Sequence, residues 1–494
     1  MKDVALAPRN HTTGTTRVGE LWLLGIALVC LLAIPFKIAM GGYAPPDDCL
    51  RHVTKAVSGR EWSDVLVLRP GVPAGFDTHP GWHALLGALH RQLGWGADAL
   101  VSFSVIFLFF VFCFVPAAMG MRIDAWLAAL FVGGLLDPGF LMRMAIGRPF
   151  VLSICAGYIV LSLWDRTLAD DGKWTPSRWM AVVAATTVAA FCHSTWYLLF
   201  LPVIATLVEG RWRVTFGLAL AVVVGVCAGA LLTGAPWDYL FYQVKHLYWT
   251  MLEDSAGAGR SEEMRPWNGN SRVAVLAVVW LALRFTTPWG RPHWRHPALV
   301  VGALGWALGW VTERIWMDWG FPCLLFWLAV EIEDVMERWQ WNGLIRRFAL
   351  TAALGLGLFL SVTNLATWRS NPVVDARRLK DQREQFAGWL PGEGGIVYST
   401  SMRVFYTWFY LFPKESWRYA PGFEQGLLPP KDAAVYRAWR TSRNPAVLAP
   451  WARALRPEDR LVVFQEEMSQ APTGLAELQW RFFPPSYWIG RKPR

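Results

Sequence analysis

Long apolar segments recur along most of this chain, and they constrain its fold more than any other feature. About 20 apolar residues are enough to cross a bilayer as an α-helix, and Leu21 to Met40 has this length. Charged residues make up 17% of the chain, against about 25% in soluble proteins. We predict an α-helical polytopic membrane protein with about eleven transmembrane helices. The predicted spans are 21–40, 98–118, 123–141, 150–164, 179–192, 197–208, 214–233, 272–288, 298–312, 320–333 and 348–367.

The distribution of lysine and arginine predicts the orientation of these spans. Cytoplasmic loops are enriched in basic residues, and a cytoplasmic N-terminal tail, 1–20, puts the basic short loops on the inner side. That tail lacks a signal-peptide cleavage pattern, so we interpret 21–40 as an anchor. An odd number of spans then places the C-terminus outside. The predicted outer regions are 41–97, 137–149, 193–196, 234–271, 313–319 and the tail 368–494.

The composition also excludes several classes of function. The net charge of +10 comes from basic residues spread singly or in pairs over short loops, which the membrane topology explains, so we expect no nucleic-acid partner. The seven cysteines show no CxxC spacing, and all but Cys49 lie in or beside apolar segments. We therefore expect buried free thiols rather than a disulfide framework or a zinc site.

Two adjacent carboxylates, Asp47 and Asp48, follow the first apolar segment. Ionisable groups at the edge of a membrane are costly unless solvated or paired, and they mark candidate functional sites. The apolar spacing from Leu50 to Val57 predicts a short amphipathic helix that lies on the membrane surface and ends at Gly59. In the alternative interpretation Asp47 is an N-cap and Asp48 complements the helix dipole. Capping and catalysis are compatible, because a cap fixes the position of a carboxylate.

Two histidines, His79 and His83, lie four residues apart in the same outer loop. This spacing can bind a metal on a helix, but Pro80 and Gly81 between them make a regular helical turn less favourable. The motif is more typical of the start of a helix from Trp82 to Leu93. Contact of the two histidines with a metal or a substrate remains the alternative.

Residues 234–271 form an aromatic outer loop around Lys245. The pattern favours an interfacial helix with an aromatic belt. A lid over a lipid substrate is the alternative, because 255–259 is a flexible glycine-containing and serine-containing stretch.

From 368 onward the chain is no longer apolar. Strands at 395–400 and 460–465 and helices at 430–439 and 445–455 predict a small α/β domain.

The chain resembles the GT-C superfamily of integral-membrane glycosyltransferases. The resemblance rests on Asp47-Asp48-Cys49, which matches the DDx form of that superfamily's first-loop signature, and on a long first outer loop followed by about ten further spans and an outer C-terminal domain. No WWDYG motif of oligosaccharyltransferases is found in the tail. The resemblance implies transfer of a sugar from a polyprenyl-phosphate carrier to a glycan, lipid or protein at the outer face of the membrane, which we expect to be a bacterial inner (plasma) membrane.

The resemblance also implies roles for individual residues. Asp47 or Asp48 would be the general base, with Asp48 favoured because Asp47 is the better cap. Some members use a divalent metal at the first-loop acid, so a metal on this pair stays open. Candidates to hold the carrier phosphate or another part of the substrate are Arg143, Arg148, Arg314, His193, His79, His83 and Lys245.

Each of these candidates has an ordinary structural alternative. Arg148 could be an arginine at the membrane edge whose charge reaches toward water. Arg314 could pair with Glu313 or Asp318, and His193 could cap its turn.

Two other functions also stay open. A polysaccharide polymerase or ligase would be expected to carry its key loop late in the chain. A transporter would need broken or polar helices at the bilayer midplane.

Overall fold

The computed structural model describes residues 17–40, 45, 48–73, 75–251, 266, 272–361, 380–381, 383–464, 468, 470–483 and 487–493. The chain forms two compact units. Unit 1 combines residues 1–41, 103–236 and 263–365, and unit 2 combines residues 42–102, 237–262 and 366–494. The predicted first outer loop and the predicted tail therefore belong to one unit, together with the segment that follows residue 236.

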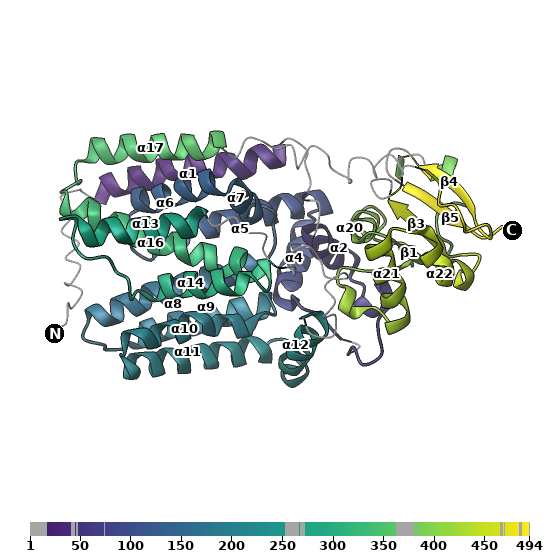
Figure 1. Cartoon of the computed structure of the whole chain (residues 1–494), viewed down its shortest axis with the longest axis horizontal. Coiled ribbons are helices and arrows are strands. Elements are labelled where there is room, and N and C mark those ends of the chain that lie inside the picture. The colour runs from purple at the N-terminus through teal and green to yellow at the C-terminus, as the bar shows by residue number, and fades with distance from the viewer. Residues whose placement is uncertain are drawn as a thin grey trace. The chain divides into compact units, whose positions relative to one another are not determined.

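Unit 1 is built from helices that run side by side (Figure 1). Every one of the eleven predicted apolar segments contains a helix. Within the described residues, six helices are long and apolar enough to cross a membrane and three more are shorter and apolar, so a count of eleven spans is not confirmed. The elements are α1 (Arg17–Met40), α5 (Ala97–Ala118, mostly in this unit), α6 (Ile123–Leu136), α7 (Pro138–Met144), α8 (Phe150–Ala169), α9 (Pro176–Cys192), η1 (Trp196–Leu199), α10 (Phe200–Thr206), η2 (Leu207–Glu209), α11 (Trp212–Leu231), α13 (Arg272–Thr286), α14 (Pro297–Gly309), α15 (Glu313–Ile315), η4 (Trp316–Gly320), α16 (Phe321–Arg338) and α17 (Leu344–Ser361).

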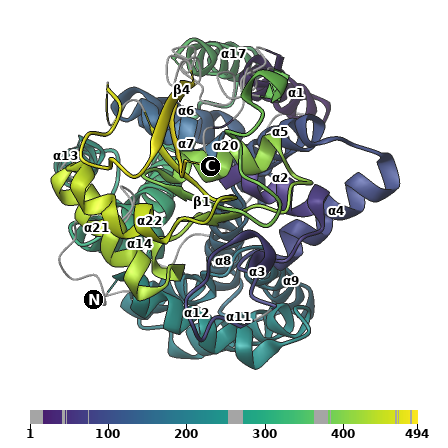
Figure 2. The same ribbon diagram turned by 90° about the vertical axis from the view of Figure 1, so that its right-hand side faces the viewer.

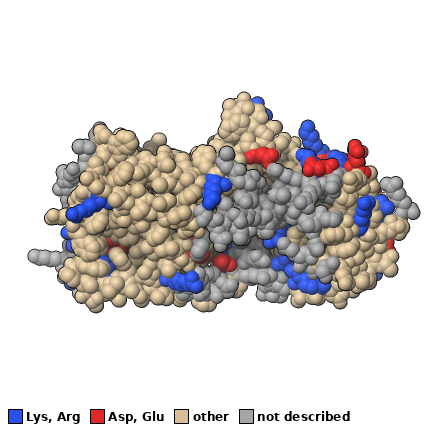
Figure 3. All heavy atoms as spheres, turned by 90° about the horizontal axis from the view of Figure 1, so that it is seen from above, with Lys and Arg blue, Asp and Glu red and all other residues tan. Residues whose placement is uncertain are grey.

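The outside of unit 1 is apolar, as expected for a surface in contact with lipid. Figure 3 shows a face of the helical part on which charged side chains are sparse. Large apolar side chains such as Phe216 and Val278 are 71% and 65% exposed. Because monomeric soluble proteins rarely expose large contiguous apolar patches, this surface and the six apolar helices indicate an integral membrane protein.

Small residues let two helices of unit 1 pack closely. Gly225 and Gly229 lie one turn apart on α11 and face α9. A Cβ at Gly229 would lie 2.8 Å from the carbonyl oxygen of Thr187, and one at Gly225 would lie 2.7 Å from that of Val183. Such small-xxx-small spacing is how membrane helices bring their backbones together.

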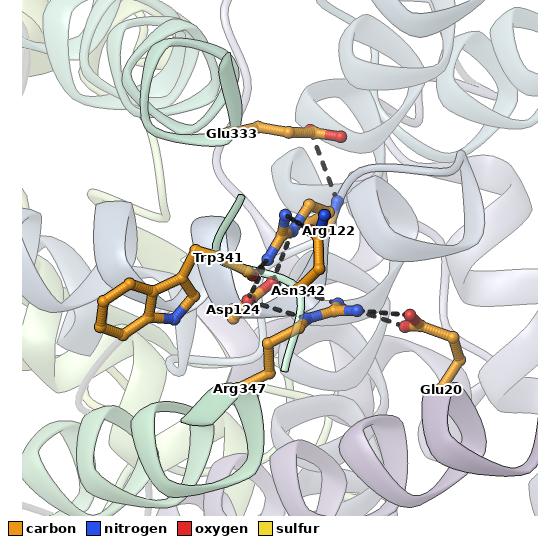
Figure 4. Close-up of polar contacts among 7 residues, drawn as sticks. All are labelled: Glu20, Arg122, Asp124, Glu333, Trp341, Asn342 and Arg347. Atoms are coloured by element: carbon orange, nitrogen blue, oxygen red, sulfur yellow. Dashed lines mark hydrogen bonds and ion pairs between the residues drawn. The ribbon is translucent and has the colours of Figure 1, made fainter. Parts of the chain in front are cut away.

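A buried network of charges joins four helices at one end of unit 1 (Figure 4). At its centre is Asp124 of α6, whose side chain is fully buried. Arg122 donates to its Oδ2 from Nη2 at 2.8 Å, and Arg347 of α17 donates to the same oxygen from Nε at 3.1 Å. Arg347 also pairs with Glu20 of α1, and the backbone N–H of Arg122 reaches Glu333 of α16. The sequence places the two arginines on the same, cytoplasmic side of the membrane.

Unit 2 contains a five-stranded sheet in the order β2-β1-β3-β5-β4. β1 is parallel to β2 and β3, while β5 is antiparallel to β3 and β4. The first loop adds to the β2 edge, where Leu66 bridges Tyr419 in parallel. The elements are α2 (Asp48–Ser58), α3 (Trp62–Val65), α4 (Pro80–Leu93), α12 (Pro236–Met251), η5 (Arg383–Phe386), β1 (Ile396–Ser399), α20 (Met402–Leu411), β2 (Arg418–Ala420), η6 (Gln425–Leu427), α21 (Pro430–Ser442), η7 (Pro445–Leu448), α22 (Ala449–Ala454), β3 (Arg460–Phe464), β4 (Gln479–Phe483) and β5 (Tyr487–Arg491).

Two helices cover the sheet and form the core of unit 2 with it. α21 and α22 lie beside the strands (Figures 1 and 2). Trp439 and Trp451 from these helices pack with Leu461 and Val463 of β3. The predicted strands at 395–400 and 460–465 are confirmed as β1 and β3, and the predicted helix at 430–439 is confirmed within α21. The predicted helix at 445–455 forms as η7 followed by α22.

Candidate functional site

The charged residues of α2 are enclosed within unit 2. Asp48, Arg51, His52 and Lys55 recur at intervals of three or four residues, which puts them on one face of the helix. All four are buried, with 8%, 4%, 1% and 8% of their surface exposed. α2 packs against α4 and α20. The predicted helix is confirmed, but its predicted position on the membrane surface is wrong, because protein covers its polar face as well as its apolar face.

Arg51 holds the carboxylate of Asp48 in place. Its Nε donates to Asp48 Oδ1 at 2.7 Å, and its guanidinium carbon lies 4.0 Å from the centre of the Phe423 ring. The ring fixes the plane of the guanidinium through a cation–π contact. Nη1 of Arg51 is buried and has no hydrogen-bond partner among the residues that the structure describes. A buried N–H without a partner is unusual in proteins and indicates a place for a hydrogen-bond acceptor from a ligand.

Three histidines gather beside this pair. His52 Nδ1 lies 2.9 Å from His83 Nε2, and His83 Nδ1 lies 2.6 Å from Asp77 Oδ2. The ring centroids of His79 and His52 lie 4.4 Å apart in an edge arrangement, and His79 Nδ1 lies 2.6 Å from Thr78 Oγ1. His79 immediately precedes α4 and His83 lies in its first turn, so the predicted start of a helix near Trp82 is confirmed.

The pKa of the Asp77 carboxyl lies below its ordinary value. Burial by itself raises this pKa, but the charge and hydrogen bond of His83, the backbone N–H of His79 and the charge of Lys55 together lower it further. The N–H of His79 donates to Asp77 Oδ1 at 2.9 Å. Asp77 is therefore a carboxylate at neutral pH and can only accept hydrogen bonds.

The described side chains of unit 2 do not form a metal site. Among the residues with described positions, no three His, Cys, Asp or Glu side chains are placed to hold one cation. The two nearest ring nitrogens of His52 and His83 face each other at hydrogen-bonding distance, and the other ring nitrogen of His83 faces Asp77. Asp47, the other proposed ligand, lies outside the described residues.

Lys245 lies on α12, a helix with two different faces. Its Nζ is 4.9 Å from the centre of the Trp249 ring, and Lys245 is exposed. Tyr242, one turn earlier on α12, is buried against Phe76, with ring centroids 4.6 Å apart. Trp237 and Phe241 are 71% and 70% exposed. A helix is confirmed in this loop, its position at a membrane interface stays a prediction, and residues 255–259, the basis of the lid alternative, lie outside the described residues.

A second cluster lies in unit 1 and contains the predicted arginines. Arg143 of α7 donates to Asp318 Oδ1 from Nε at 2.7 Å, and Arg314 donates to Asp318 Oδ2 from Nε at 3.3 Å. Asp318 lies in the π-helical turn η4, and such turns are frequent at functional sites. Gly305 of α14 allows this turn to approach, because a Cβ at Gly305 would lie 2.7 Å from the backbone N of Gly320.

Arg148 and His193 both contact residues near the start of α8, as Arg143 does. The guanidinium carbons of Arg143 and Arg148 lie 5.1 Å and 5.8 Å from the centre of the Phe150 ring. His193 Nδ1 contacts the hydroxyl of Ser153, also on α8, at 3.0 Å. Residues from three predicted outer loops therefore lie together at one end of unit 1. Two of these arginines share Asp318, and arginine is suited to an anionic group such as a phosphate.

The structure adds residues that the sequence prediction did not assign to the site. Arg51, Asp77 and His52 complete the cluster around Asp48, His79 and His83, and Asp318 organises the arginines of unit 1. A sequence signal existed for Arg51 and His52, which lie three and four residues after Asp48. The role of Asp77 depends on the fold, because its carboxylate meets His83 only after the chain turns into α4.

Comparison with known proteins does not identify a family: no protein-family model and no curated protein matches the chain.

Proposed function

We propose that this protein is a membrane glycosyltransferase that transfers a sugar from a polyprenyl-phosphate carrier to a glycan, lipid or protein acceptor at the outer face of a membrane. The observation that carries the proposal is the buried, charged face of α2, with Asp48 held by Arg51. Burying charges is unfavourable unless they are paired, and such groups cluster where chemistry is done. The resemblance of Asp47-Asp48-Cys49 to the GT-C signature is the reason to propose sugar transfer as the reaction.

In this proposal the acceptor hydroxyl attacks the anomeric carbon of the sugar, and the bond from that carbon to the phosphate oxygen breaks. A carboxylate must orient the hydroxyl and take its proton. Asp48 is the proposed carboxylate, and Asp47 remains an alternative. Arg51 supports this role because its Nε hydrogen bond fixes one oxygen of Asp48, and its Nη1 can donate to an oxygen of the substrate.

The departing polyprenyl phosphate carries negative charge that needs stabilisation. The proposed groups for carrier binding in unit 1 are Arg143, Arg148 and Arg314, with His193 beside them. A shared carboxylate, Asp318, fixes two of these arginines, so little side-chain entropy remains to be lost when an anion binds. The apolar helices would accommodate the polyprenyl chain in the bilayer. The α/β part of unit 2 is proposed to recognise the acceptor.

The proposed localisation is a bacterial inner membrane with the N-terminus in the cytoplasm and the tail outside. α12 supports contact of unit 2 with a membrane surface, because its exposed face carries Trp237, Phe241 and Tyr248. Tryptophan and tyrosine prefer the level of the lipid headgroups.

The direct test is release of polyprenyl phosphate from a panel of polyprenyl-phosphate hexoses and pentoses by the purified protein in liposomes. We expect at least one donor to be consumed by the wild-type protein and Asp48→Asn to abolish release. Asp64→Asn is the matched control, because Asp64 lies in the same loop on α3 and is exposed. It should retain activity.

Two results would count against the proposal. One is normal activity in both Asp48→Asn and Asp47→Asn. The other is the absence of release from every donor in the panel, together with the absence of a polyprenyl-phosphate lipid from mass spectra of the purified protein. If a carrier lipid co-purifies, the mass of its sugar identifies the donor.

A further inference from the structure

Two neutral polar side chains of unit 2 carry buried atoms without hydrogen-bond partners. The hydroxyl of Tyr242 on α12 has no partner among the residues that the structure describes, although Tyr242 is only 6% exposed. In Gln425, the first residue of η6, the amide nitrogen and the amide oxygen are both buried and likewise lack partners in the described part of the chain. Buried polar atoms nearly always have partners, so these three atoms can be satisfied by a ligand. Gln425 as a whole is partly exposed, which gives a ligand access from the surface of unit 2.

Contacts of one arginine bring these two residues into the same part of unit 2. The ring of Tyr242 lies edge-on to that of Trp249, with ring centroids 5.8 Å apart. The guanidinium carbon of Arg69 lies 4.1 Å from the centre of the same Trp249 ring. Nη1 of Arg69 also donates to the carbonyl of Gly426 at 3.3 Å. Because Gly426 follows Gln425 directly, Arg69 links the start of η6 to the surroundings of Tyr242.

Two opposite charges act on the Tyr242 hydroxyl. Burial raises the pKa of Tyr242 above its ordinary value, the charge of Arg69 lowers this pKa, and the charge of Glu424 raises it. Glu424 directly precedes Gln425, so this effect also places the start of η6 near the hydroxyl. With its raised pKa the hydroxyl is neutral at pH 7 and can both donate and accept a hydrogen bond.

The three atoms suit the hydroxyl groups of a carbohydrate better than an anion. Tyr242 Oη and Gln425 Nε2 can donate, whereas Gln425 Oε1 can only accept. An ionised phosphate or carboxylate offers acceptors alone and would leave Gln425 Oε1 unsatisfied. A sugar hydroxyl donates and accepts, and it carries no charge that Glu424 would repel.

We propose that Tyr242 and Gln425 bind hydroxyl groups of a carbohydrate, and that this carbohydrate is part of the acceptor. The binding site stands on the contacts above, whereas its role toward the acceptor rests on the proposed function. The position of the site supports this role. Phe423, two residues before Gln425, contacts Arg51, which holds Asp48. One short segment therefore contacts the proposed base's partner and also carries part of the carbohydrate site.

Tyr242→Phe is the sharpest perturbation, because it removes the hydroxyl and keeps the ring. It breaks no hydrogen bond to a described residue and removes a buried polar atom that has no described partner. We expect Tm of the ligand-free protein, followed by tryptophan fluorescence, to stay the same or to rise. A hydroxyl with a structural role would instead lower Tm. Gln425→Met is a second variant with a side chain of similar length, and it should also keep its Tm.

The first measurement is carbohydrate binding, which needs no donor. The purified protein in detergent micelles is studied by saturation-transfer NMR with the methyl α- and β-glycosides of glucose, galactose, mannose and arabinose. We expect the wild type to bind at least one of them, and Tyr242→Phe and Gln425→Met to raise its Kd about 3- to 10-fold. Tyr248→Phe is the matched control, because it makes the same change on the same helix at a tyrosine that is 55% exposed. Its Kd should stay within about twofold of the wild-type value.

The second measurement separates an acceptor sugar from the sugar of the donor. The glycoside that binds is added as the acceptor in the assay of polyprenyl phosphate release. We expect KM for the glycoside to rise about 3- to 10-fold in Tyr242→Phe, with KM for the donor changed less than about twofold. A change in the donor KM alone, or a bound glycoside that leaves the release rate unchanged, would overturn the acceptor role.

The outcomes keep the two proposals apart. If the wild type binds no glycoside, or if Tyr242→Phe lowers Tm and leaves Kd unchanged, the carbohydrate site is wrong, while release that depends on Asp48 keeps the proposed function in place. Binding of inorganic phosphate that Tyr242→Phe weakens would also overturn the site. If a glycoside binds through Tyr242 but no donor is consumed, the site stands and its acceptor role falls together with the proposed function.

Discussion

Asp124→Asn should strongly destabilise unit 1. The Asp124 carboxylate is fully buried and accepts four hydrogen bonds, two from Arg122 and two from Arg347, with lengths between 2.8 Å and 3.3 Å (Figure 4). Two of the donors reach each oxygen. Whichever way the asparagine amide is turned, its NH₂ group therefore faces two N–H donors, and two bonds are lost.

The size of the effect follows from these contacts. Each hydrogen bond that involves a charged group contributes about 1.5–3 kcal/mol, so losing two costs about 3–6 kcal/mol. Removing one partner of a buried ion pair costs about 3–5 kcal/mol, and the two estimates agree. At about 2–4 °C per kcal/mol for a unit of this kind, Tm should fall by roughly 6–24 °C.

The buried thiols of unit 1 provide the assay. Cys113, Cys155 and Cys323 are buried, so a thiol-reactive fluorescent dye labels them only as the helices unfold on heating. Asp170→Asn is the control, because Asp170 also pairs with an arginine but its side chain is 56% exposed. An exposed pair contributes about 0–1 kcal/mol, and Tm should change by no more than about 2–4 °C. A similarly small change in Asp124→Asn would refute the reasoning.

Two further predictions concern the candidate sites. Gly305→Ala should displace the turn that carries Asp318 and destabilise unit 1 by about 1–3 kcal/mol in the thiol assay. Gly25→Ala on α1 is its control, because nothing lies within 4 Å of the added Cβ, and it should be neutral or stabilising. Since the pKa of Asp77 lies below its ordinary value in the folded protein, its contribution to the free energy of unfolding is complete above about pH 4 and is lost at lower pH. Asp77→Asn should therefore lower Tm at pH 7, and its effect should shrink as the pH falls below about 4; an effect that does not shrink with falling pH would contradict this.

Local periodicity predicted whether most segments are helices or strands, because it does not depend on which other element a segment packs against. Every predicted apolar segment contains a helix, and β1 and β3 lie where the Gly395–Thr400 and Arg460–Gln465 segments predicted strands. The number of spans could not be predicted in the same way. Helices such as α6 and α14 are apolar but shorter than a bilayer requires. Whether a short apolar helix crosses a membrane or packs inside a helical unit depends on its neighbours, which composition does not specify.

The candidate site was predicted in its residue types and only partly in its contacts. Arg314 pairs with Asp318 four residues later, and this spacing predicts the pair as the structural alternative for Arg314. The contact of Arg143 with the same carboxylate joins residues 175 positions apart, which requires α7 and η4 to meet. Likewise, Asp48 was predicted as a functional acid, whereas the ring of Phe423 that holds its partner Arg51 comes from the far end of the chain.

Helix α2, whose predicted position on the membrane surface was wrong, provides the clearest functional argument. Its apolar spacing fits a helix on a membrane surface, and the same spacing gathers Asp48, Arg51, His52 and Lys55 on the other face. On a membrane surface that face would contact water, and its charges would need no further explanation. In the structure protein covers it, and an apolar face of similar volume would fold at least as stably, because desolvation of buried charges offsets much of their attraction. The buried charges on this face of α2 lower the stability of the fold, and they form directed contacts. Proteins tolerate such a loss of stability mainly where activity depends on it, so this face has the properties of a reactive site.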